Sequence, residues 1–142
     1  MKPIRAARPI SASTDVYAVI GDPIRHSLSP AIHNCWIEEE GLEAVYLALN
    51  LKGDDPADAM RAAFDLGFSG LNVTLPYKGA ALAAATRVDP LARRLGAANV
   101  LVRGETGWIA HNTDQMGVRA ALAYAAPDLN LTGKQVLLIG AG

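Results

Sequence analysis

Side chains that could carry out chemistry are concentrated in three short segments, and each segment follows a predicted strand. The segments are GDPIRHSLS, NVTLPYK and HNTD, and they hold the candidates Ser27, Ser29, Asn72, Thr74, Lys78, Asn112 and Asp114. Asparagine amides and hydroxyls both donate and accept hydrogen bonds, which suits a polyhydroxylated ligand. A lysine ammonium can give up a proton, and an aspartate beside it in a cleft completes a candidate pair for proton transfer.

Ser27 and Ser29 come immediately before a predicted helix, where two hydroxyls could bind an anion with help from the helix dipole. Each candidate also has an ordinary structural interpretation. Ser29 could cap the helix, with Ser27 serving only as part of the loop. Lys78 could be a solvated surface charge, and Thr113 or Asp114 could cap the last helix. The local patterns leave both interpretations open.

The elements that must position these side chains alternate between strand-like and helix-like patterns. Short apolar runs predict strands at 16–21, 44–51 and 70–73, a hairpin at 99–111 and a last strand at 136–139. Helices are predicted within 29–41, 54–67, 89–96 and 113–126, together with an alanine-rich helix after residue 78. Asp55 and Asp89 are each followed by proline, which predicts N-caps. The alternation predicts an α/β fold with a mainly parallel sheet and flanking helices, in which ligands bind beyond the carboxyl ends of the strands.

Composition and charge narrow the class of protein. The 142 residues carry a formal net charge of −1, which gives no electrostatic footprint for nucleic acid or for an anionic membrane. No run approaches the ~20 apolar residues that a bilayer span needs. A single cysteine, Cys35, excludes an internal disulfide, and we expect it in the core. His26, His33 and His111 share no metal-ligand spacing, so no metal site is expected. The cytoplasm is the default location.

The last residues of the sequence, LLIGAG, are an apolar run that leads into glycine. A strand that enters a glycine turn typically precedes a helix whose N-terminus binds a phosphate, as in dinucleotide-binding folds. Gly140, Ala141 and Gly142 would belong to that turn. Because the turn has two of the usual three glycines and no following helix, we do not expect the 142-residue chain to hold a dinucleotide.

The order of the motifs resembles the shikimate dehydrogenase family. GDPIRHSLSPAIHN, GLNVTLPYK, GAANVL and HNTD occur in succession, as do the family patterns G-x-P-x-x-H/K-S-x-S-P-x-x-H-N, N-V-T-x-P-x-K, G-A-x-N and N-T-D. The resemblance runs from about residue 17 to residue 142, and its first two motifs are specific. It implies a substrate-binding domain over residues 15–112, followed over 113–142 by a linker helix and the first strand and glycine turn of an incomplete NADP-binding Rossmann domain.

The activity that the resemblance implies is the NADPH-dependent reduction of 3-dehydroshikimate to shikimate, a step in aromatic amino-acid biosynthesis. Ser27 and Ser29 would hold the substrate carboxylate. The remaining roles would fall to Asn72, Thr74, Asn99 and Asp114 as ligands of the ring hydroxyls and to Lys78 as the catalytic residue, oriented by Asp114. As hydride reaches the carbonyl carbon, negative charge grows on the oxygen, and an ammonium there can stabilise it and donate the proton.

The resemblance also sets expectations for cofactor and partners. Gly140, Ala141 and Gly142 would begin the NADP site, although NADP is not expected to bind this truncated chain. The implied partner is the small-molecule substrate, with neither nucleic acid nor membrane, and a homodimer is an option.

Two departures from the family pattern keep alternatives open. Val100 stands where the family often has threonine, and Gln115 stands where glycine commonly follows N-T-D. A dehydrogenase that accepts quinate or an amino-shikimate fits almost as well. A different class of function is a non-catalytic shikimate-binding module that acts as a sensor or a partner subunit. A folate dehydrogenase or a tRNA-linked reductase shares the two-domain plan but lacks the first two motifs.

Overall fold

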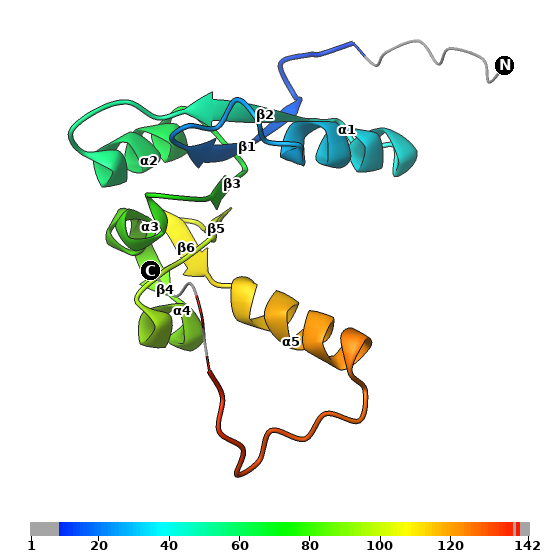
Figure 1. Ribbon diagram of the computed structural model, residues 1–142. Coiled ribbons are helices and arrows are strands. Elements are labelled where there is room, and N and C mark those ends of the chain that lie inside the picture. The colour runs from blue at the N-terminus through cyan, green and yellow to red at the C-terminus, as the bar shows by residue number, and fades with distance from the viewer. Residues whose placement is uncertain (1–8, 138, 140–142) are drawn as a thin grey trace, which may run out of the picture. The chain divides into compact units, whose positions relative to one another are not determined.

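The computed structural model describes residues 9–137 and 139, and the chain divides into two compact units (Figure 1). The first unit runs from Met1 to Asn112 and the second from Thr113 to Gly142. All of the sheet belongs to the first unit, and one helix belongs to the second. The sequence predicts a boundary at the same position, and the assignment of the two parts as substrate-binding domain and linker helix stays a prediction.

The first unit is built on a six-stranded sheet with the strand order β2-β1-β3-β5-β6-β4. Its strands are β1 (Asp15–Gly21), β2 (Ala44–Asn50), β3 (Gly70–Val73), β4 (Ala85–Val88), β5 (Val100–Arg103) and β6 (Trp108–His111). The pairs β1–β2, β1–β3 and β4–β6 are parallel, whereas β3–β5 and β5–β6 are antiparallel. The predicted α/β class with a mainly parallel sheet is therefore confirmed, and the predicted hairpin is β5–β6.

Strand β4 is not among the predicted elements, because its sequence follows an alanine-rich run that predicts helix. Helix α3 ends at Ala84 and β4 begins at the next residue, Ala85. The β-branched residues Thr86 and Val88 fit a strand, and β6 supplies the parallel neighbour that a strand here needs. Local propensity favours helix, and pairing with a distant segment decides the outcome.

The other helices of the first unit are α1 (Ser29–Glu39), α2 (Pro56–Asp65) and α4 (Pro90–Leu95), and α3 spans Lys78–Ala84. Two of the predicted N-caps are confirmed: the Asp55 carboxylate accepts from the Asp58 N–H at 2.9 Å, and the Asp89 carboxylate accepts from the Leu91 N–H at 2.8 Å. Each aspartate satisfies an N–H group that has no partner within its own helix.

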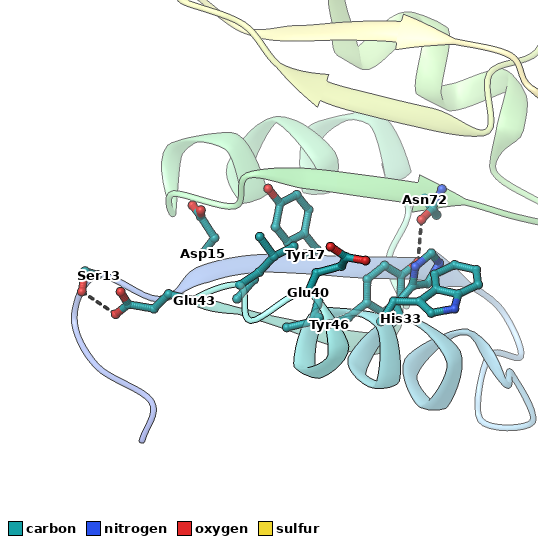
Figure 2. A pocket seen from close by; sticks show the side chains of 12 residues that line it. Ser13, Asp15, Tyr17, His33, Glu40, Glu43, Tyr46 and Asn72 are labelled. Atoms are coloured by element: carbon teal, nitrogen blue, oxygen red, sulfur yellow. Dashed lines mark hydrogen bonds between the residues drawn. The ribbon is translucent and has the colours of Figure 1, made fainter. Parts of the chain in front are cut away.

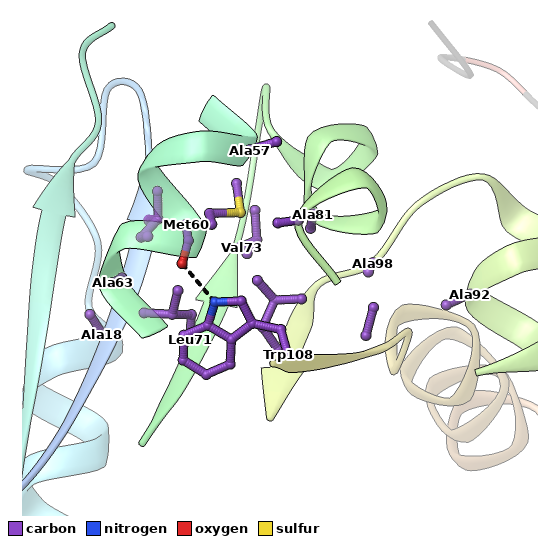
Figure 3. Close-up of a cluster of buried hydrophobic side chains, with 14 residues drawn as sticks. Ala18, Ala57, Met60, Ala63, Leu71, Val73, Ala81, Ala92, Ala98 and Trp108 are labelled. Carbon is purple, nitrogen blue, oxygen red and sulfur yellow. Dashed lines mark hydrogen bonds between the residues drawn. The ribbon is translucent and has the colours of Figure 1, made fainter. Parts of the chain in front are cut away.

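The two faces of the sheet have separate cores. On β1, Ala18 and Ile20 face α2 and α3, whereas Tyr17 and Val19 face α1, because side chains alternate along a strand. We refer to these surfaces as the α2/α3 face and the α1 face. The larger core lies on the α2/α3 face, and Figure 3 shows Trp108 at its centre, donating from Nε1 to the Met60 carbonyl oxygen at 2.6 Å.

The second unit contains helix α5 (Asp114–Ala125) and the segment that follows it. The strand predicted at 136–139 is not formed by its described residues, 136, 137 and 139, and this prediction is wrong for them. A strand in a sheet depends on hydrogen bonds to a neighbouring strand, and these residues pair with no described strand. Gly140, Ala141 and Gly142, the predicted start of a cofactor site, lie outside the described residues.

Candidate functional site

The parallel register of β1 and β3 brings two of the three predicted segments together. Ile20 pairs with Val73 near the carboxyl ends of the two strands. Beyond that pair, the Thr74 N–H donates to the Ile20 carbonyl oxygen at 2.9 Å, and the Asp22 N–H donates to the Leu75 carbonyl oxygen at 3.2 Å. The loop that carries the two serines and the loop that carries NVTLPYK therefore start side by side.

A glycine permits this close approach of the two loops. A Cβ atom added at Gly21 would lie 2.6 Å from Thr74 Cγ2 and 3.1 Å from the Leu75 carbonyl oxygen. Distances this short require something to move, so a side chain at position 21 would push the two loops apart. The sequence signal for this position is only a glycine at the end of an apolar run.

Antiparallel pairing adds Asn99 to the same edge of the sheet. The Val73 N–H donates to the Asn99 carbonyl oxygen at 2.9 Å, and the Asn99 N–H donates to the His111 carbonyl oxygen at 3.1 Å. The start of α3 is fixed there as well, because the Ala98 N–H donates to the Lys78 carbonyl oxygen at 2.9 Å. The ends of β3 and β6 and the start of β5 thus meet, and a ligand site beyond these strand ends stays a prediction.

Ser27 and Ser29 are both half-buried at the entrance to α1. The alternative in which Ser29 caps this helix is wrong, since Leu28 holds the N-cap position without a side-chain hydrogen bond. The Ser27 Oγ atom accepts from the Ser29 N–H at 3.2 Å. A hydroxyl oxygen that accepts from the backbone still has its own proton, so Ser27 can donate to an anion in front of the helix.

Two residues outside the predicted set hold the serine loop in place. The Asn50 side chain, at the end of β2, accepts from the Ile24 N–H at 3.2 Å and donates to the Asp22 carboxylate at 3.1 Å. Because Asn50 closes a strand and Asp22 opens a loop, the sequence shows ordinary turn residues at both positions. Their pairing across 28 residues is visible only in the fold.

Asn72 belongs to β3 and points to the α1 face, where its Oδ1 atom accepts from the Tyr46 hydroxyl at 2.6 Å. It lines a pocket of about 550 Å³ that extends along α1. Figure 2 shows the pocket between β1, β2 and α1, with Asn72 at one end and the Ser13–Glu43 hydrogen bond at the other. Of the predicted site residues, Asn72 is the one that lines this pocket, so the pocket and the strand-end site overlap only there.

Lys78 is the first residue of α3 and is half-buried. The turn before it is closed by the Tyr77 N–H, which donates to the Thr74 carbonyl oxygen at 2.9 Å, and by the Tyr77 hydroxyl, which donates to the Leu51 carbonyl oxygen at 3.0 Å. Asp114 is the first residue of α5 and belongs to the second unit. The pairing of Lys78 with Asp114 stays a prediction.

The histidine and asparagine of the first motif pack and make hydrogen bonds, as predicted. The Asn34 side chain donates to the Tyr46 carbonyl oxygen at 2.8 Å and accepts from the Tyr46 N–H at 2.9 Å. The His33 ring stacks on the Tyr46 ring, with centroids 4.1 Å apart. The core position predicted for Cys35 is wrong: its side chain is exposed, because the helix positions on either side of it, 34 and 37, are the ones that face the sheet.

The described residues hold neither a candidate metal cluster nor a candidate membrane span. No group of three or more His, Cys, Asp and Glu side chains among them is placed to hold a metal ion. None of the helices within the described part of the chain is long and apolar enough to cross a membrane. The side chains predicted for the strand-end site are hydroxyls, amides, one ammonium and one carboxylate, a set that suits hydrogen bonding to a small polar molecule.

Comparisons with known proteins find relatives of this chain in both sequence and fold. The family model described as the shikimate dehydrogenase substrate binding domain matches residues 19–101. The shikimate dehydrogenase (NADP(+)) of Hyphomonas neptunium is 44% identical over 129 residues, which cover 91% of this chain and 47% of that protein. The crystal structure of shikimate dehydrogenase from Aquifex aeolicus superimposes with a TM-score of 0.81 at 34% identity, covering 86% of this chain and 46% of the other.

A further solved structure holds ligands. Shikimate 5-dehydrogenase from Thermus thermophilus, in complex with NADP(H) and shikimate, has a TM-score of 0.72 and 38% identity, and the match covers 79% of this chain and 42% of that one. The chain spans about half the length of the curated relatives it matches. The family model covers more than half of the chain, and most of the chain superimposes on solved members. The chain therefore belongs to the family of shikimate dehydrogenase substrate-binding domains.

Proposed function

We propose that this chain forms the substrate site of an NADP-dependent shikimate dehydrogenase, which interconverts 3-dehydroshikimate and shikimate in aromatic amino-acid biosynthesis. One observation carries the proposal. The backbone register brings the serine loop, the NVTLPYK turn and Asn99 to one edge of the sheet. An anion site, neutral hydrogen-bonding groups and an ammonium next to one another match a hydroxylated ring that bears a carboxylate.

Ser27 and Ser29 would bind the substrate carboxylate. The Ser27 hydroxyl can donate while its oxygen is held by the Ser29 N–H, so the group is oriented before the ligand arrives. The helix N-terminus directly behind it favours negative charge. This part of the site would anchor the substrate and take no part in bond making.

Asn72, Thr74 and Asn99 would bind the ring hydroxyls, and Lys78 would act at the reacting oxygen. NADPH, when bound, supplies the hydride. Lys78 would stabilise the negative charge that grows on the carbonyl oxygen and donate the proton that completes the hydroxyl. Asp114 would orient the ammonium and share the contact to that hydroxyl. Gly140, Ala141 and Gly142, which are predicted to begin the NADP site, lie outside the described residues.

The test is shikimate-dependent reduction of NADP⁺ by the full-length protein, with NAD⁺ as the comparison cofactor. We expect turnover with NADP⁺ and shikimate. Absence of turnover with shikimate, quinate and an amino-shikimate alike would contradict the proposal. Calorimetry on the 142-residue chain tests the non-catalytic alternative, which is supported if the chain binds shikimate and does not bind NADP. Turnover in the full-length protein then distinguishes an enzyme from a binding module.

A dehydrogenase that also accepts quinate is the second candidate, and Val100 favours it. Val100 pairs with Asn72 in the β3–β5 register, so a position without a hydroxyl lies next to a predicted ligand of the ring. Fewer hydrogen-bonding groups beside the ring reduce the penalty for a differently substituted substrate. The ratio of kcat/KM for shikimate to that for quinate measures this preference, and Val100→Thr should raise the ratio.

The location and assembly of the protein complete the proposal. We place the enzyme in the cytoplasm and expect a homodimer, in keeping with a biosynthetic enzyme that uses small soluble substrates. Light scattering after gel filtration of the full-length protein measures the oligomeric state. A monomer over the whole accessible concentration range would contradict the dimer and leave the site unaffected.

A further inference from the structure

The hydroxyl of Tyr46 makes a short hydrogen bond to Asn72, a residue that is predicted to bind the substrate. It donates to the Asn72 Oδ1 atom at 2.6 Å, which lies at the short end of the range for O–H···O bonds. The Tyr46 side chain is 5% exposed, so water competes little for this bond. Burial raises the pKa of Tyr46 to about 12, and the hydroxyl therefore keeps its proton at any physiological pH.

This bond determines which end of the Asn72 amide faces away from Tyr46. A side-chain amide has an acceptor end, Oδ1, and a donor end, Nδ2, and a half-turn exchanges them. If the amide were turned, Nδ2 would donate to the tyrosine oxygen, and the buried Tyr46 O–H would lose its acceptor. Leaving a buried donor unpaired is unfavourable, so the observed orientation is the stable one. In Figure 2 the Asn72 oxygen faces Tyr46 and the nitrogen points away from it.

Tyr46 is itself held on three sides. The Asn34 side chain bonds to both its backbone N–H and its backbone carbonyl oxygen, and the His33 ring stacks on its ring. His33 and Asn34 are the last two residues of the SPAIHN stretch that begins α1. Both of them contact Tyr46 directly and so hold in place the residue whose hydroxyl bonds to Asn72. Helix α1 thereby connects the serine end of the site to the asparagine end.

We propose that Tyr46 is a positioning residue, which fixes the Asn72 amide so that Nδ2 donates to a hydroxyl oxygen on the ring of the substrate. The proposal rests on the assignment of Asn72 to the substrate site. It assigns Asn72 the role of donor to the substrate, because Oδ1 is turned toward Tyr46 and Nδ2 faces away from it (Figure 2). Within the part of the chain that the structure describes, Nδ2 makes no hydrogen bond, so its two protons are available to a ligand.

A double-mutant cycle on the full-length protein tests this role. The dissociation constant of shikimate is measured by calorimetry for wild type, Tyr46→Phe, Asn72→Ala and the double variant. Tyr46→Phe removes the hydroxyl and keeps the stacked ring, and it should weaken binding about three- to tenfold, the value of one hydrogen bond. In the Asn72→Ala background the same substitution should have no further effect. A purely structural role for Tyr46 would give the same weakening in both backgrounds.

Tyr17→Phe provides the matched control. Tyr17 lines the same pocket, and its hydroxyl makes no hydrogen bond to a described residue, so its removal should leave shikimate binding unchanged. Equal effects of Tyr46→Phe in the two Asn72 backgrounds, or no effect in either, would overturn the positioning role while the proposed function stands. If the wild-type protein binds no shikimate, the proposed function fails, and the ligand role of Asn72 fails with it.

Discussion

Both faces of the sheet bury a large aromatic side chain that donates a hydrogen bond of 2.6 Å, but the acceptors differ in kind. On the α2/α3 face, Trp108 donates to the backbone carbonyl oxygen of Met60. On the α1 face, Tyr46 donates to the side-chain amide of Asn72. A backbone carbonyl inside a helix has a fixed position, whereas a side-chain amide can turn. The first bond therefore adds to the fold, and the second selects one orientation of a group that can meet a ligand.

The surroundings of the two rings follow the same division. Trp108 packs among Met60, Leu71, Leu101 and many alanines, a close-packed apolar core. Tyr46 packs against a histidine, beside an open pocket whose lining includes carboxylates. We infer that substitutions on the α2/α3 face change stability, that those on the α1 face change ligand binding, and that the strand-end edge they share carries the chemistry.

Lys78→Ala should have the largest effect, and it tests the assignment of chemistry to the shared edge. In the full-length enzyme we expect kcat to fall about 10²- to 10⁴-fold, the usual contribution of a positioned acid. KM should change no more than a few-fold, because the ammonium matters most once charge develops on the oxygen. Steady-state kinetics measure both, and Lys52→Ala, an exposed lysine in the loop after β2, is the control. Near-normal kcat in the Lys78 variant would refute the assignment.

Met60→Ala tests the α2/α3 face. The Met60 side chain is fully buried at the centre of the larger core. Its truncation should lower the free energy of unfolding by about 2–5 kcal/mol, because a cavity replaces packed atoms. Urea titration measures the change, and Leu66→Ala, at an exposed position just after α2, should change it by less than about 0.5 kcal/mol. A large change in shikimate affinity of the folded protein would show that the two faces are not independent.

Ser27→Ala tests the anion site at the start of α1. A hydrogen bond to a charged group contributes roughly 1.5–3 kcal/mol, so KM for shikimate should rise about ten- to a hundredfold. The carboxylate is far from the reacting carbon and is held about equally in ground and transition states, so kcat should stay within a few-fold. Ser13→Ala removes a hydroxyl at the other end of the α1-face pocket and should leave KM unchanged. A fall in kcat without a rise in KM would mean that Ser27 contributes to the chemical step.

Most of the fold is predictable from the sequence, because the signals are local. Asp55 and Asp89 before proline mark the starts of α2 and α4, and alternating apolar residues mark the strands. Strand β4 escapes prediction because only its pairing with β6 makes it a strand. The strand predicted at 136–139 is not formed by its described residues because a local apolar run cannot supply its own neighbours.

The sequence indicates which residues are candidates for the site, but it does not show which hydrogen bonds hold them in place. Motif order and the family resemblance select Ser27, Asn72 and Lys78 as candidates, and the register of β1, β3 and β5 explains why such distant segments meet. Tyr46 and Asn50 escape prediction, since a tyrosine and an asparagine in a strand have no distinctive spacing. Their importance comes from hydrogen bonds that span 26 and 28 residues, to Asn72 and Asp22.

The smallest expected effect is confined to alkaline pH and distinguishes Tyr46 from its counterpart Trp108, which does not titrate. Burial raises the pKa of Tyr46 from 10.0 to about 12, so the folded state holds the hydroxyl proton more tightly than the unfolded state does. The stability that depends on this proton is fully present below a pH of about 10 and is lost as the pH rises through about 12.

Integrated over that window, the loss amounts to about 2 kcal/mol by a pH of about 12. Other groups also titrate there, so the quantity to measure is the difference in unfolding free energy between wild type and Tyr46→Phe, by urea titration at increasing pH. Tyr46→Phe should start out less stable and lose this pH dependence, so that the two curves converge at the alkaline end. Curves that stay parallel would show that the Tyr46 hydroxyl is not held in a protected, proton-donating state, and the difference between the two faces would then be one of packing alone.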